Sequence, residues 1–216
     1  FQAGIAATEW SWAPLVADFD NDQDKDIFIS NGIQGATNDM DFVNFISNDH
    51  IQSKLGKGMT TQDLALIDKL PEKKVANYFF KNNGDATFTN TSNTWATSTP
   101  SFSNGASYAD LDNDGDLDIV VNNVNEPASI LENHSEKAPQ TNHYIQIEFK
   151  GHAPNTQGIG AQVTIYTPSA TQYFENYTTR GYLSATPPEI VTGLGPHKRI
   201  DSVVVRWPSQ KKQVLN

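Results

Sequence analysis

Two nine-residue segments of this chain carry carboxylates at alternate positions. Asp18–Asp26 reads DFDNDQDKD and Asp110–Asp118 reads DLDNDGDLD, so both follow the pattern D-x-D-N-D-x-D-x-D. Aspartates packed this closely repel one another, and a folded turn needs a cation to hold them together. Calcium suits such a set because it accepts about six to eight oxygen ligands at flexible geometry. We name these segments loop 1 and loop 2 and expect one calcium ion in each.

The expected ligands follow from the positions of the aspartates within each loop. Positions 1, 3, 5 and 9 supply side-chain carboxylates, and position 7 supplies its backbone carbonyl. In loop 1 the predicted ligand residues are Asp18, Asp20, Asp22, Asp26 and, through its carbonyl, Asp24. In loop 2 they are Asp110, Asp112, Asp114, Asp118 and, through its carbonyl, Asp116. An acidic turn without an ion is the alternative. It weighs more for loop 1, where Gln23 replaces the glycine that a sharp turn favours.

The segments on either side of the loops distinguish them from EF-hands. An EF-hand loop lies between two helices and places a bidentate glutamate at about position 12. That position holds Ile29 after loop 1 and Val121 after loop 2. The flanking segments 14–17 and 27–30 are rich in β-branched and apolar residues, as strands are. Each loop is therefore predicted to be a turn between two strands.

This order of strand, acidic loop, strand and asparagine-rich turn resembles the FG-GAP/VCBS repeats. Asn82–Phe88, with the sequence NNGDATF, is similar to the family's N-N-G-D-G-T-F turn. Such repeats build β-propeller blades in integrin α-chains and in many secreted bacterial proteins. Toward the C-terminus, four blocks resemble an ASPIC/UnbV domain of the kind found in cartilage acidic protein and in Bacteroidetes-type surface proteins. These blocks are Gly158–Ala161, Arg180–Ser184, Gly193–Gly195 and Val203–Pro208.

The resemblance implies a mainly β chain with two parts. Residues 1–136 would form two to three blades of a β-propeller, whereas a closed propeller needs about four to eight. Further blades of the same longer chain are expected to complete it. Apolar residues at helical spacing predict a helical insertion at about 36–76, which either covers a blade edge or binds a partner. Residues 137–142 read as a linker, and 143–216 as a small β-sandwich-like domain that is incomplete at its C-terminus.

Composition narrows the function classes. The net charge of -10 with only 15 Lys and Arg residues argues against binding nucleic acid. The absence of cysteine excludes disulfides and cysteine-ligated zinc. No apolar run approaches the ~18 residues that a membrane-spanning helix needs. Calcium loops of this kind suit compartments with abundant calcium, so we expect an extracellular or bacterial cell-surface location, associated with the outer membrane.

Catalytic motifs of the common hydrolases and phosphate-binding enzymes are missing from the sequence. We therefore expect a non-enzymatic binding or scaffold module with a protein or a glycan as its surface partner. One alternative is an accessory lipoprotein subunit of a bacterial outer-membrane uptake or assembly complex. Another is a lectin-like glycan binder that stacks sugars on its tryptophans, although core packing is the competing role for these rings. The tryptophans are Trp10, Trp12, Trp95 and Trp207.

Overall fold

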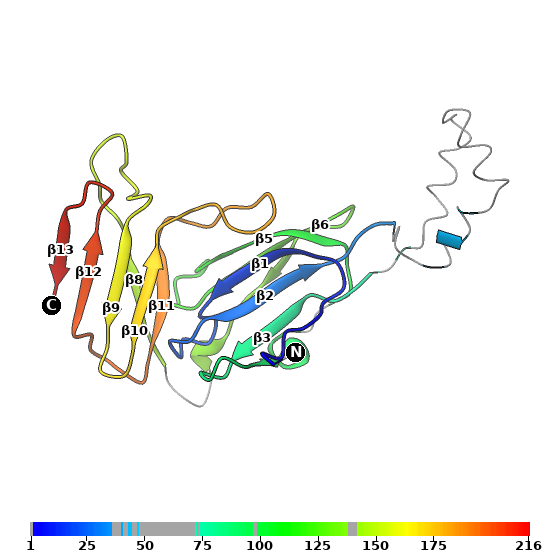
Figure 1. Cartoon of the computed structure of the whole chain (residues 1–216), viewed down its shortest axis with the longest axis horizontal. Coiled ribbons are helices and arrows are strands. Elements are labelled where there is room, and N and C mark those ends of the chain that lie inside the picture. The colour runs from blue at the N-terminus through cyan, green and yellow to red at the C-terminus, as the bar shows by residue number, and fades with distance from the viewer. Residues whose placement is uncertain are drawn as a thin grey trace.

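The structure is a computed structural model of the chain. It describes residues 2–35, 74–96, 99–137 and 142–216, together with residues 40, 43, 44, 47 and 72. Antiparallel strands dominate these residues (Figure 1). The predicted helical insertion at 36–76 lies almost entirely outside the described residues and stays a prediction. Within the described part of the chain, no helix has both the length and the apolar character needed to cross a membrane.

The first sheet has four antiparallel strands in the order β1-β2-β3-β4. Their bounds are Ser11–Ala17 for β1, Asp26–Asn31 for β2, Tyr78–Asn82 for β3 and Phe88–Asn90 for β4. Side chains alternate along β1, where Leu15 is buried and its neighbour Val16 is exposed. Such alternation is expected when only one face of a sheet packs on a core.

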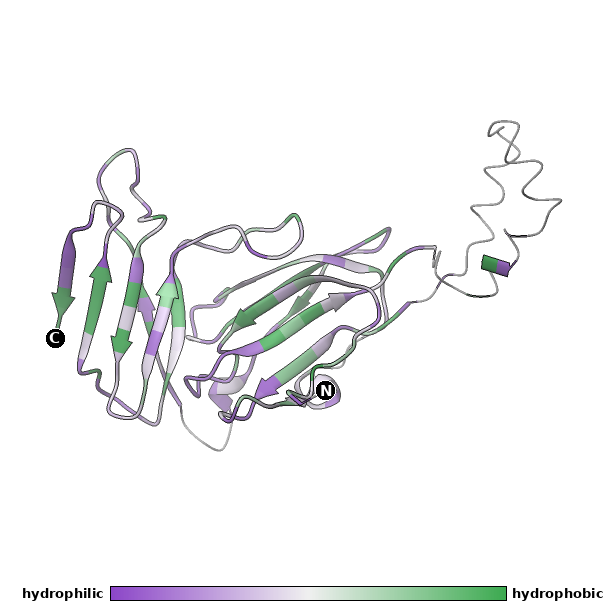
Figure 2. Cartoon of the chain, in the orientation of Figure 1, coloured by the Kyte–Doolittle hydropathy of each residue, from purple (hydrophilic) through white to green (hydrophobic). Residues whose placement is uncertain are grey.

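A second sheet, of three antiparallel strands, packs against the first. Its order is β5-β6-β7, with bounds Ser103–Ala109, Asp118–Asn123 and Ser129–Leu131. Leu15 and Phe28 of the first sheet share one apolar core with Ile119 and Val121 of the second. Figure 2 shows the hydrophobic residues concentrated along these strands. A short helix, α3 (Ser92–Trp95), adds its tryptophan to the edge of the core.

The C-terminal strands form two further sheets around a separate core. One has the order β10-β9-β12-β13, and the other pairs β11 with β8. In chain order the bounds are His143–Ile147 for β8, Gln162–Tyr166 for β9, Thr171–Glu175 for β10, Ile190–Gly195 for β11, Ser202–Arg206 for β12 and Lys212–Leu215 for β13. Val163, Val205 and Leu194 meet in the core between the sheets. These strands gather at one end of the molecule in Figure 1.

Both acidic loops are turns between the first two strands of a sheet. Loop 1 joins β1 to β2, and loop 2 joins β5 to β6. The pairs Ala17–Asp26 and Ala109–Asp118 close the two turns in equivalent register. The described residues thus place the two loops in the same local setting, as the sequence predicts.

Candidate metal centres

The first aspartate of each loop folds the turn back on itself. In loop 1, the carboxylate of Asp18 accepts hydrogen bonds from the backbone amides of Asp22 at 3.0 Å and Gln23 at 2.9 Å. In loop 2, Asp110 accepts from the amides of Asp114 at 3.2 Å and Gly115 at 3.1 Å. The repeated pattern D-x-D-N-D therefore encodes one backbone shape twice.

Two positions in each loop adopt the left-handed backbone conformation. Position 4 is asparagine in both loops, with φ of 59° at Asn21 and 63° at Asn113, and asparagine tolerates this region well. Position 6 has φ of 86° at Gln23 and 94° at Gly115. Glycine enters this region without penalty, whereas glutamine is strained there. The glutamine in loop 1 thus needs compensating contacts, and these come from the C-terminal sheets.

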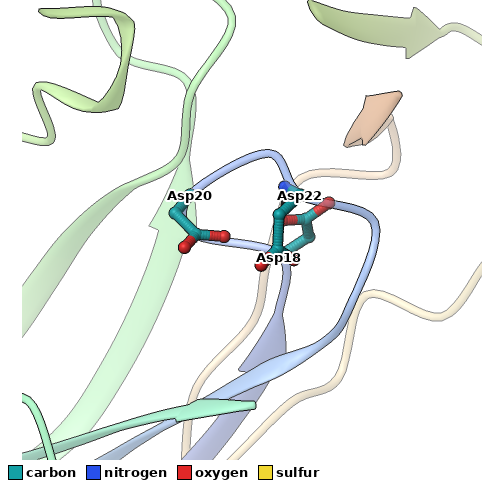
Figure 3. Close-up of side chains that lie close together, drawn as sticks. All are labelled: Asp18, Asp20 and Asp22. Carbon is teal, nitrogen blue, oxygen red and sulfur yellow. Dashed lines mark hydrogen bonds between the residues drawn. The ribbon is translucent and has the colours of Figure 1, made fainter. Parts of the chain in front are cut away.

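The carboxylates at positions 1, 3 and 5 converge in both loops. Figure 3 shows Asp18, Asp20 and Asp22 side by side on the turn between β1 and β2. In each loop, one carboxylate oxygen from each of these three positions lies within 4.8 Å of the other two. This is the geometry in which carboxylates share a cation. The corresponding residues of loop 2 are Asp110, Asp112 and Asp114.

The aspartates at position 9 hold the neighbouring strand instead of joining these clusters. Asp26 accepts hydrogen bonds from the amides of Phe19 at 3.1 Å and Asn82 at 2.9 Å. Asp118 accepts equivalent bonds from the amides of Leu111 and Asn133, at 3.0 and 2.8 Å. Each aspartate therefore links its own loop to the chain at the third strand, on β3 in the first sheet and just after β7 in the second.

At position 7, the two loops diverge. The side chain of Asp24 in loop 1 is exposed, whereas Asp116 in loop 2 is buried and accepts from the amide and hydroxyl of Ser135 at 2.9 and 3.0 Å. Asp116 also belongs to a second acidic cluster, with Asp114 and Glu136. The sequence analysis did not single out Glu136. The sequence feature that could have indicated Glu136 is its position after Asn133, because Asp85 follows Asn82 at the same spacing.

Two buried oxygens support a cation at these loops. Oδ1 of Asp20 and Oδ1 of Asp116 have no hydrogen-bond donor among the described residues. A buried carboxylate oxygen without a partner is strongly unfavourable, and a bound cation would satisfy it. Burial raises the pKa of Asp18 to about 8 and that of Asp26 to about 7, and neighbouring aspartates add to both shifts. A divalent cation would reverse these shifts by favouring the ionised carboxylates. The residues present therefore fit calcium.

Loop 1 already contains a cation from the protein itself. Nζ of Lys81, on β3, donates hydrogen bonds to Oδ2 of Asp20 and, at 2.7 Å, to Oδ2 of Asp22. Burial lowers the pKa of Lys81, but the hydrogen bonds to the two aspartates outweigh burial and raise it overall. The ammonium group also lies 5.8 Å from the centre of the Trp95 ring. The sequence analysis missed this lysine because it follows loop 1 by more than fifty residues.

Loop 1 is also a contact surface for the C-terminal sheets. The amide of Gly193, on β11, donates to Oδ2 of Asp18 at 3.0 Å, and the amide of Gly195 donates to the carbonyl of Asn21 at 3.0 Å. A Cβ atom on Gly193 would lie only 2.2 Å from the backbone of Asn21. Glycine is required at this position because the two backbones touch.

The strained glutamine of loop 1 is held by the turn between β9 and β10. Oε1 of Gln23 accepts from the hydroxyl of Thr167 at 2.8 Å, and its Nε2 donates to the hydroxyl of Ser169 at 3.2 Å. The adjacent Lys25 donates to the carbonyl of Tyr173 at 2.9 Å. These hydrogen bonds explain why loop 1 carries glutamine where loop 2 carries glycine.

The two loops also touch each other. Nδ2 of Asn21 donates to the carbonyl of Gly115 at 3.1 Å. The ring of Tyr144 covers Gly115 so closely that an added Cβ would lie 2.0 Å from it. Loop 2 therefore needs glycine at position 6 for space as well as for backbone conformation.

Comparison with known protein families agrees with the resemblance noted in the sequence. The model of the FG-GAP-like repeat matches residues 61–121, a span that includes loop 2. The model described as ASPIC and UnbV matches residues 151–216. No curated protein matches the chain. The FG-GAP-like repeat suggests that the first two sheets are propeller blades, although the described residues do not close a ring. The chain therefore combines an FG-GAP-like repeat with an ASPIC/UnbV domain.

Proposed function

We propose that this chain is a non-enzymatic binding or scaffold module that calcium stabilises outside the cytosol. The observation that carries the proposal is the convergence of three carboxylates in each acidic loop, beside buried oxygens without donors. FG-GAP and ASPIC/UnbV domains are typical of extracellular binding modules, which supports the same assignment. We propose in addition that the protein lies at a bacterial cell surface, associated with the outer membrane.

The calcium ions in this proposal have a structural role. Each loop connects two strands of one sheet, and its last aspartate bonds to the chain at the third strand, on β3 or just after β7. An ion at positions 1, 3 and 5 would neutralise repelling carboxylates only when the turn is folded, so its binding energy would add to the stability of the sheet. The outer surface of the sheets would then be free to bind a partner.

Calorimetric melting of the chain in millimolar calcium and in EDTA tests the calcium-stabilised fold. We expect a higher melting temperature in calcium, because an ion that binds only the folded state stabilises it by about 2.7 kcal/mol at about one hundred times its dissociation constant. Magnesium is the control, since it demands a tighter octahedral geometry and should stabilise less. Identical melting curves in calcium and EDTA would contradict the proposal.

A protein is a better-supported binding partner for this chain than a glycan. All four tryptophans pack against aromatic rings of the chain itself: Trp10 on Trp12 at 6.5 Å, Trp12 on Tyr182 at 4.6 Å, Trp95 on Phe79 at 6.2 Å and Trp207 on Phe149 at 6.0 Å between ring centres. Rings used in this way present less surface for stacking sugars. Ile130, on the outward face of β7, is 66% exposed, and such a residue suits contact with a further blade or a protein partner.

Two binding assays separate the candidate partners. Calcium-dependent capture of a protein from outer-membrane extracts would support the scaffold role and, within it, the accessory-lipoprotein alternative. Saturable binding to a glycan array that Trp10→Ala abolishes would instead favour the lectin alternative. The Asp112→Ala variant is the matched control, because it weakens the calcium site without altering a tryptophan.

A further inference from the structure

The chain on β3 of the first sheet and just after β7 of the second places different charges at one equivalent position. The amide of Asn82 donates to the last aspartate of loop 1 at 2.9 Å, and that of Asn133 donates to the last aspartate of loop 2 at 2.8 Å. The side chains of both asparagines also donate to the carbonyl at position 8 of their loops, at 3.1 and 3.2 Å. The residue before each asparagine is Lys81 in the first sheet and Glu132 in the second. These two residues are structural equivalents of opposite charge.

Lys81 sits between the carboxylates that would hold the ion of loop 1. Its ammonium group donates to Asp20 and Asp22, which occupy positions 3 and 5. In the described part of the chain, no lysine or arginine forms an ion pair with an aspartate of loop 2. The nearby Lys137 pairs with Glu136 at 3.1 Å instead. Loop 1 thus has an internal counter-charge, whereas loop 2 has additional carboxylates beside it.

The surroundings of loop 1 strengthen this difference. Asp18 is only 4% exposed, and its oxygens already accept hydrogen bonds from three backbone amides, including that of Gly193. Position 8 is Lys25 in loop 1 and Leu117 in loop 2, which adds a second positive charge to loop 1 alone. Asp112, at position 3 of loop 2, is exposed to solvent. An incoming divalent ion therefore meets more open and more negative surroundings at loop 2.

We propose that Lys81 is a built-in counter-ion of loop 1, so that loop 2 is the tight calcium site and loop 1 binds calcium only by displacing the lysine. The inference rests on the proposed calcium function and deepens it, since it assigns the two loops different affinities. An ion entering loop 1 must break the hydrogen bonds of the ammonium group to two carboxylates and share their charge with it. At loop 2, the same ion meets no such competitor among the described residues.

Isothermal titration calorimetry of calcium into the whole chain tests this assignment. The wild-type chain should show one tight site and a second site that is weaker by about tenfold or more, which corresponds to about 1.4 kcal/mol. Lys81→Gln should tighten the weak site about tenfold and leave the tight site unchanged. Lys81→Met, which keeps most of the length of the side chain without its charge, should give the same result and controls for new hydrogen bonds from the glutamine amide.

Matched variants identify which loop produces each site. Asp112→Ala should remove the tight site, whereas Asp20→Ala should remove the weak one. Glu132→Gln changes the equivalent position of the second sheet and should weaken the tight site only slightly, by less than about threefold. Circular dichroism verifies that each variant retains its fold.

The outcomes of the titrations distinguish the proposed role of Lys81 from the proposed calcium binding on which it rests. Two equal sites in the wild-type chain, unchanged in both Lys81 variants, would overturn the role of Lys81 and leave the calcium function standing. A tight site that Asp20→Ala abolishes and Asp112→Ala spares would overturn the assignment as well. No calcium binding by the wild-type chain or by either Lys81 variant would overturn the calcium function itself.

Discussion

Loop 1 and loop 2 share one sequence pattern and one backbone shape, yet they face different surroundings. Loop 1 is buried against the C-terminal sheets and pairs with Lys81. Loop 2 is more exposed at its tip and lies beside Glu136. The aspartates determine the shape of the turn, and we infer that residues distant in the sequence determine how strongly each turn attracts a cation. A motif repeated in one chain can therefore serve two purposes.

The two purposes follow from what each loop touches. Loop 1 presents its backbone and Gln23 to the ASPIC/UnbV domain and so links the two parts of the chain. Loop 2 contacts loop 1 through the carbonyl of Gly115 but keeps its outer carboxylates in solvent. We therefore infer that loop 1 serves mainly to connect the two parts of the chain and that loop 2 serves mainly to bind an ion.

The largest expected difference between the loops is in calcium-dependent stability. Asp114→Ala should remove most of the stabilisation that calcium produces. That stabilisation is up to about 2.7 kcal/mol of unfolding free energy at about one hundred times the dissociation constant. The matched variant Asp22→Ala should retain most of that stabilisation, because Lys81 already compensates loop 1. Calorimetric melting of both variants with and without calcium measures the difference. Equal losses in the two variants would remove the distinction between the loops.

The contact between loop 1 and β11 should be the next most sensitive feature. Gly193→Ala places a methyl group against the backbone of Asn21 and should destabilise the chain by about 1–3 kcal/mol, the usual range for overpacking. Gly105→Ala is the matched control, because its nearest neighbour is the hydroxyl of Ser184, which can rotate away. Urea unfolding compares the two variants. A Gly193 variant no less stable than the Gly105 variant would show that the contact is loose.

Ion-free loop 1 should also make stability depend on pH. In EDTA, burial raises the folded-state pKa of Asp18 to about 8 and of Asp26 to about 7, above the ordinary value of 3.8. Between about pH 4 and pH 8, the folded chain then holds protons that the unfolded chain has released, so stability falls as pH rises. Each such proton changes the free energy of unfolding by about 1.4 kcal/mol per pH unit, so stability near pH 6 should exceed that near pH 7.5 by about 2 kcal/mol or more. Urea unfolding in EDTA at both pH values measures this, and greater stability at the higher pH would contradict it.

The smallest expected effect concerns the glutamine of loop 1. Gln23→Gly relieves the left-handed backbone but loses the hydrogen bonds to Thr167 and Ser169, so the two changes should nearly cancel. Gln23→Ala loses the same bonds and keeps the strain, and it should be less stable than the glycine variant by about 1 kcal/mol. Chemical unfolding of both variants separates strain from bonding. An alanine variant as stable as both the wild-type chain and the glycine variant would show that neither matters.

Much of the local structure could be predicted from the sequence. The alternating aspartates and their apolar flanks predicted two strand-to-strand turns, and both are present. The blocks near the C-terminus indicated the ASPIC/UnbV domain that the family model matches. These features are encoded by neighbouring residues, which the sequence displays directly. The domain bounds and the full ligand sets remain predictions.

The features that distinguish the loops could not be predicted from local pattern. Lys81 reaches loop 1 because β3 pairs with β2 across the intervening segment, and Gly193 reaches it from the far end of the chain. Both contacts depend on how the strands pair and the sheets pack, and the spacing of residues within a loop does not predict this. Gln23 did stand out as a departure from glycine, but its reason lies in Thr167 and Ser169, which lie in the turn between β9 and β10.

Anomalous diffraction would test most directly the unequal calcium loading that we propose for the two loops. Crystals of the whole chain, equilibrated with less calcium than the sites can hold, would be measured at a wavelength where calcium scatters anomalously. We expect a strong anomalous peak among Asp110, Asp112 and Asp114 and a markedly weaker one, or none, in loop 1. A peak in loop 1 equal to or stronger than that in loop 2 would contradict it.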